Sequence, residues 1–140
     1  MKISVVPGEK LTPELVLRWS QLQRRDPALA SPYFRPEFTR AVAAVRDDVE
    51  VGVMRQGGEV VGFFPYQRSR RNVGRPVGGR LSDYQGVIAQ SGVCWDAEEL
   101  LRGCRLRAWH FDHLLTAQEP FSKYHRVAAE SPYIDIGDGT

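Results

Sequence analysis

The stretch VEVGVMRQGGEVVGFFPYQ, residues 49–67, predicts a β-hairpin at the centre of a sheet. Its first arm alternates, with valines at 49, 51 and 53 on one face of a strand. Gly57 and Gly58 supply the positive φ angles that a tight hairpin turn requires. The second arm, residues 60–67, is apolar on both faces, so we expect it in the middle of the sheet. Pro65 removes one backbone donor, which indicates a bulge or an unpaired position there.

Upstream of the hairpin, the sequence predicts one strand and two helices. Residues 2–6 form a short β-like run that Pro7 and Gly8 stop. Thr12 and Pro13 are a cap and a first helical residue, and the helix should end near residue 25 because Asp26 precedes a proline. This helix buries Leu15, Trp19 and Leu22. A second helix opens at Pro36, with an apolar stripe of Phe38, Ala41, Val42 and Val45.

Downstream, residues 69–82 read as a connection rich in glycine and arginine. A strand at 86–89, a helix that Asp96 caps and a strand at 108–113 follow, with short extended pieces at 124–129 and 133–136. The order β-α-α-β-β-β-α-β predicts a single α/β domain over residues 1–140. We expect a mostly antiparallel, twisted sheet with helices on both faces.

Composition narrows the classes of function. The chain has 140 residues, of which 42% are hydrophobic and 26% charged, as in an ordinary globular domain. A net charge of +2 is too small to indicate a nucleic-acid partner, and none is expected. Two cysteines without a Cys-x-x-Cys motif indicate reduced thiols. No apolar run approaches a membrane span and no signal-peptide core is present, so we expect a cytoplasmic chain without a transmembrane segment.

Five motifs, in order along the chain, resemble one protein family. The chain is similar to the N-terminal half of the CelD-type (cellulose-biosynthesis-type) acetyltransferases of the GNAT superfamily, which are related to the Fem-type aminoacyl transferases. The motifs are Trp19 in the first helix, SPYFRPEF at 31–38, GFFPY at 62–66, LSDY at 81–84 and SPYIDI at 131–136.

This resemblance implies a GNAT-like half fold. It also implies an acyl-CoA-dependent N- or O-acyltransferase that acts on a polysaccharide or cell-envelope sugar precursor, with acetyl-CoA as co-substrate. Members of the family carry two GNAT-like halves, so the chain is expected to stop before a second half and to be inactive alone. A second half or a homo-oligomer is then the expected partner. The alternative is a non-catalytic module that binds an anionic partner or completes another chain.

The resemblance suggests Arg71, Gly74 and Arg75 as a site for the CoA pyrophosphate. GNAT enzymes bind it with a loop of the form Arg/Gln-x-x-Gly-x-Gly/Ala, and residues 71–76 match the first half of that pattern. Pro76 replaces the last small residue and removes an amide. A site for another anion and an ordinary solvated basic loop remain open as alternatives.

Three further side chains are candidate catalytic residues. Asp83 and Tyr84, at a strand entrance, could orient an acceptor or act as base and acid, or could simply form a turn. His110 shares one strand face with Asp112 and could act as a general base, or it could be an outer position of a half-buried strand. No metal site is expected, because His110 and His113 would lie on opposite strand faces.

Overall fold

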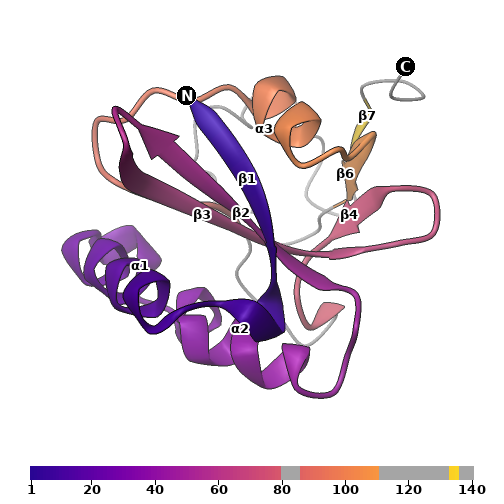
Figure 1. Ribbon diagram of the computed structural model, residues 1–140, viewed down its shortest axis with the longest axis horizontal. Coiled ribbons are helices and arrows are strands. Elements are labelled where there is room, and N and C mark those ends of the chain that lie inside the picture. Colours follow the sequence, from indigo (N-terminus) through magenta and orange to yellow (C-terminus); the bar gives the residue numbers. More distant parts are fainter. Residues whose placement is uncertain (80–85, 111–132, 136–140) are drawn as a thin grey trace.

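The computed structural model describes residues 1–79, 86–110 and 133–135. Within them the chain forms three α-helices and seven strands, which follow one another along the sequence in nearly the predicted order (Figure 1). The elements are β1 (Lys2–Pro7), α1 (Pro13–Arg25), α2 (Pro36–Ala43), β2 (Val49–Gln56), β3 (Glu59–Arg68), β4 (Val73–Arg75), β5 (Ile88–Ala89), α3 (Ala97–Gly103), β6 (Ala108–His110) and β7 (Tyr133–Asp135).

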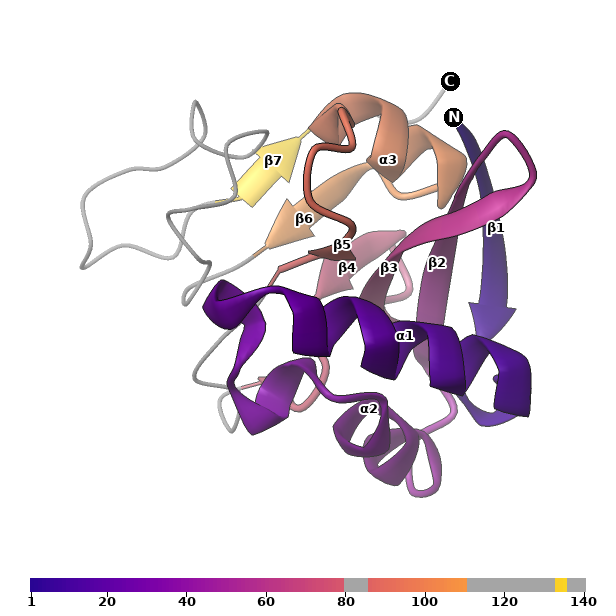
Figure 2. The ribbon, with the colours of Figure 1, turned by 90° about the vertical axis from the view of Figure 1, so that its left-hand side faces the viewer.

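The strands form one sheet in the order β1-β2-β3-β4-β6-β7, with β5 also paired to β3. All pairings among the described strands are antiparallel except that between β4 and β6. Helices α1 and α2 cover one face of this sheet, and α3 covers the other (Figures 1 and 2). The predicted fold class, a mixed α/β domain with a mostly antiparallel sheet and helices on both faces, is confirmed.

Each face of the sheet has its own apolar core. On the α1 side, Trp19 is fully buried and stacks on Phe63 of β3, with 5.0 Å between ring centroids. Its indole N–H donates to the Phe34 carbonyl oxygen at 2.7 Å, which fixes the segment between the two helices. On the α3 side, Leu101 packs with Phe64 in the second core cluster. The strand β3 therefore contributes buried side chains to both cores, as its sequence predicts.

The central hairpin forms at the predicted turn. Gln56 pairs with Glu59, and Gly57 and Gly58 have φ angles of 61° and 84°. The bulge, however, lies at a different residue from the one predicted. The register shifts between Met54 and Arg55, so Val61 is the extra residue on β3, whereas Pro65 pairs regularly with Val51.

Pro65 instead lies at a gap on the outer edge of β3. This edge pairs with β5 at Gly62 and Phe63 and with β4 at Gln67 and Arg68. The Gln90 amide donates to the Val61 carbonyl on the outer edge, and the Arg68 amide donates to the Asp48 carbonyl on the β2 side. The backbone N–H and C=O groups of the odd-numbered residues of β3 therefore point to the outer edge. The backbone N–H that Pro65 lacks would thus point into the gap between β4 and β5, so its absence costs no hydrogen bond to either strand.

Two other expectations are corrected. The connection expected at 69–82 contains a strand, β4, which pairs with β3 on one side and with β6 on the other. Helix α2 ends at Ala43, and its buried residues are Pro36, Thr39 and Ala43. Of the predicted stripe, Ala41 is exposed and Val45, beyond the helix end, is 81% exposed.

Candidate functional site

A groove of about 660 Å³ lies where the end of α2, the end of β3 and the turn after β4 meet. Drug-sized ligands and cofactors occupy cavities of this order. One wall is apolar and comes from the end of α2, and the other wall is polar. The apolar wall includes Val42 and Val45, and the polar wall includes Arg46, Asp48, Gln67, Arg68 and Arg75.

The turn at residues 76–79 closes one side of the groove. The Gly79 amide donates to the Pro76 carbonyl at 3.0 Å, and Gly78 has a φ of 83°, which suits glycine. A Cβ on Gly78 would lie 2.7 Å from the Phe38 ring, so only glycine lets the turn approach α2 this closely. The Gly78 amide donates to the Gln67 side chain at 2.8 Å. Both glycine amides are therefore already bonded within the protein.

A chain of polar contacts runs along the floor of the groove. The Gln67 amide donates to Asp48 Oδ1 at 3.0 Å, and Arg46 donates to Asp48 Oδ2 at 2.7 Å. The hydrogen bond from Arg46 holds the pKa of the Asp48 carboxyl below its usual range. Asp48 is thus an ionised, fully engaged acceptor at neutral pH, and it positions Gln67 for its bond to Gly78.

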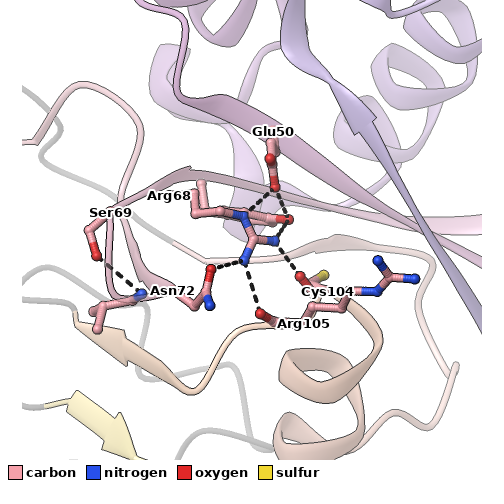
Figure 3. A network of polar contacts seen from close by, with 8 residues as sticks. Glu50, Arg68, Ser69, Asn72, Cys104 and Arg105 are labelled. Carbon is pink, nitrogen blue, oxygen red and sulfur yellow. Dashed lines mark hydrogen bonds and ion pairs between the residues drawn. The ribbon is translucent and has the colours of Figure 1, made fainter. Parts of the chain in front are cut away.

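Arg68 connects the groove to helix α3 (Figure 3). Its Nε donates to Glu50 Oε1 at 2.9 Å, and the Tyr66 hydroxyl donates to the same oxygen at 2.8 Å. Its Nη1 donates to Asn72 Oδ1 at 3.1 Å and to the Arg105 carbonyl at 2.9 Å, and its Nη2 donates to the Cys104 carbonyl. One guanidinium therefore joins β2, the β3–β4 turn and the residues that follow α3.

The cysteine and phenol beside this guanidinium are buried. Burial raises the pKa of the Cys104 thiol to about 12 and raises that of the Tyr66 hydroxyl above its ordinary value. Both groups stay protonated at neutral pH, so neither is a ready nucleophile or base. Tyr66 instead donates to Glu50, and the cluster acts as a brace between the sheet and α3.

Among the described residues of the groove, positive charge exceeds negative charge after these pairs are counted. Three arginines line it, and two of them are bound to carboxylates, Arg46 to Asp48 and Arg68 to Glu50. Arg75 is exposed and makes no side-chain hydrogen bond or ion pair within the described part of the chain. The groove can therefore bind an anion through the guanidinium of Arg75, assisted by the free edge of Arg46.

The three residues predicted to bind the CoA pyrophosphate lie in different surroundings. Arg75 lines the groove, whereas Arg71 is exposed in the β3–β4 turn. Gly74 is buried within β4, and a Cβ there would lie 2.8 Å from Leu106, so this glycine allows close packing of the strand. A CoA role for these residues stays a prediction.

Of the three predicted catalytic residues, the structure describes His110 alone. Asp83 and Tyr84 lie outside the described residues, as does Asp112, the predicted partner of His110. His110 ends β6, is half-buried and pairs with Tyr133 of β7 in the register. It does not line the groove.

Asp48 and Gln67, which sequence reasoning missed, face each other because of the hairpin register. Val49 pairs with Gln67, and the Arg68 amide donates to the Asp48 carbonyl. Counting back from the turn at Gly57 and Gly58 would have placed Asp48 opposite Gln67, and the extra residue at Val61 moves that pairing by one position. No comparable local pattern in the sequence indicates that α2 and the turn at residues 76–79 line the same groove.

Within residues 1–79, 86–110 and 133–135 no group of three or more His, Cys, Asp or Glu side chains is placed to hold a metal ion. No helix of the same residues is long and apolar enough to cross a bilayer. In comparisons with known proteins, no family model, no curated protein and no solved structure matches this chain.

Proposed function

We propose that this chain is the anion-binding part of an acyl-CoA-dependent N- or O-acyltransferase that acts on a polysaccharide or cell-envelope sugar precursor. The observation that carries the anion-binding step is the guanidinium of Arg75 in the groove, which has no partner among the described residues. The acyltransferase step rests on the motif resemblance. The order of elements, with two helices before an antiparallel meander and a third helix on the opposite face, supports it.

The groove suits a ligand with a charged end and an apolar part. Phosphate esters such as acyl-CoA or an activated sugar present planar sets of oxygens, which arginine binds in pairs. Val42 and Val45 would contact the uncharged part of the ligand. Because the amides of Gly78 and Gly79 are already bonded, the side chain of Arg75 would make the principal contact with the anion.

One guanidinium gives a weak site. We therefore expect residues 1–140 alone to bind acetyl-CoA with a dissociation constant weaker than about 1 µM, which corresponds to about −8 kcal/mol. Calorimetry on the purified chain tests this expectation. A submicromolar constant would show that the described half already contains a complete CoA site.

A second candidate function, a non-catalytic module that binds an anionic partner, has one observation in its favour. Asp48 is the one carboxylate among the described residues that line the groove, and it already accepts bonds from Arg46 and Gln67. Its lowered pKa makes it a poor proton acceptor. A groove with this lining binds an anion without offering a base for transfer chemistry.

Acyl transfer is tested on the product of the whole gene by following release of the CoA thiol with amino-sugar and sugar acceptors. We expect turnover to fall at least about tenfold in the Asp83→Asn, Tyr84→Phe double variant, while the melting temperature stays unchanged. Arg75→Glu reverses the charge that the groove offers to an anion. Its matched control is Arg25→Glu, which reverses an exposed charge at the end of α1. If no acceptor releases thiol while the groove still binds anions, the non-catalytic module is the correct function.

A further inference from the structure

Two loops far apart in the sequence lie side by side at one end of the sheet. One is the β3–β4 turn at residues 69–72, and the other is the connection at 104–107 between α3 and β6. The Arg107 amide donates to the Asn72 carbonyl at 2.9 Å. Arg68 holds the two loops together by donating both to Asn72 Oδ1 and to the Arg105 carbonyl (Figure 3).

Three exposed arginines on these loops form what we call the arginine rim: Arg70, Arg71 and Arg105. None of the three makes a side-chain hydrogen bond or an ion pair within the described residues. Glu50, the carboxylate that Arg68 contacts, is already bound to both Arg68 and Tyr66. Among the residues that the structure describes, the rim is therefore a set of like charges without local neutralisation, and none of the three lines the groove.

Arg105 occupies a backbone position that favours glycine. The Leu106 amide donates to the Leu101 carbonyl and the Arg105 amide to the Arg102 carbonyl, which is the double bond pattern of a Schellman helix end. The residue at this position needs a left-handed backbone, and Arg105 has a φ of 57°. An arginine here is less stable than glycine, so its presence indicates a use for the side chain.

We propose that the arginine rim binds the phosphates of anionic lipids at a bilayer surface. Exposed loops can engage several headgroups at once, and guanidinium groups pair well with phosphate. Residues 69–72 and 104–107 contain no aromatic side chain, so they lack the stacking platform typical of single-stranded nucleic-acid binding. This inference does not depend on the proposed acyltransferase function, which concerns the separate groove.

The test is co-sedimentation of residues 1–140 with phosphatidylcholine vesicles that contain or lack phosphatidylglycerol. We expect binding only to the anionic vesicles, and loss of that binding at high salt. The triple variant Arg70→Ala, Arg71→Ala, Arg105→Gly should bind roughly a hundredfold more weakly, since each basic residue near an anionic surface contributes about a factor of five. The control triple Arg25→Ala, Arg35→Ala, Arg40→Ala removes the same charge from exposed positions elsewhere and should bind nearly as well as the wild type.

Equal losses in the two triple variants would refute a specific rim, because net charge alone would then explain binding. Wild-type protein that binds heparin or RNA but not the anionic vesicles would also refute the proposal. Arg105→Gly alone provides a further check. It should weaken vesicle binding while the melting temperature stays the same or rises, whereas a lower melting temperature would show that Arg105 is retained for the fold.

Discussion

Replacing Arg68 by methionine should destabilise the protein, because its guanidinium joins three segments. The substitution removes the ion pair with Glu50 at 2.9 Å and the donors to the Asn72 side chain and to the Cys104 and Arg105 carbonyls. A buried ion pair that loses one partner costs about 3–5 kcal/mol. The side chains of Arg68 and Glu50 are 21% and 27% exposed, so water recovers part of that loss. We expect a cost of about 2–4 kcal/mol in the free energy of unfolding.

The assay is urea unfolding of the wild type, Arg68→Met, Arg68→Lys and Glu50→Gln, with the two-state slope checked for each. Lysine keeps the charge but has a single nitrogen, so it cannot reach every acceptor, and it should cost less than methionine. The double variant Arg68→Met, Glu50→Gln should show a coupling of about 1 kcal/mol or more between the two sites. A loss below about 0.5 kcal/mol for Arg68→Met would refute the bracing role and make this a solvated surface arginine.

Three other predictions concern the cores and the groove. Trp19→Ala should cost about 3–5 kcal/mol of unfolding free energy, because a fully buried ring stacked on Phe63 is lost, and an unchanged urea midpoint would contradict that packing. A thiol reagent should modify exposed Cys94 in the native protein and reach Cys104 only after unfolding, because Cys104 is buried and burial raises its pKa to about 12. Fast reaction of both thiols in the native protein would contradict this. The bond to Arg46 lowers the pKa of Asp48, so the stability that this carboxylate contributes is present at neutral pH and is lost as pH falls below about 4. The unfolding free energy of Asp48→Asn should therefore fall less than that of the wild type over that range. Parallel pH profiles of the two proteins would count against the Arg46–Asp48 pair.

Local signals in the sequence predicted much of the fold. Thr12 and Asp96 were expected as helix caps, and each accepts a bond from an amide three residues later. The two glycines of the hairpin turn set the first pairs of β2 and β3, and the extra residue at Val61, which the sequence did not predict, sets the register beyond them and hence which side chains face each core. Burial of Trp19 followed from its spacing with Leu15 and Leu22, because a helical period specifies one face.

Other features depend on contacts between distant segments, which local patterns do not encode. Strand β4 has only three residues, with a glycine in the middle, and it exists because β3 and β6 pair with it on either side. Arg68 directly precedes the connection rich in glycine and arginine, and no local pattern indicates its partner, yet the hairpin register puts Glu50 within reach of it. Arg75, by contrast, stays unpaired among the described residues, and only the tertiary arrangement places it in a groove.

The most direct test of the central claim is a titration of ¹⁵N-labelled residues 1–140 with pyrophosphate, followed by NMR chemical shifts. We predict saturable shifts at the side chains of Arg75 and Arg46, loss of these shifts in Arg75→Glu, and normal shifts in the control Arg25→Glu. Shifts that persist in Arg75→Glu, or that are confined to residues away from the groove, would contradict the claim that this groove binds an anion through Arg75.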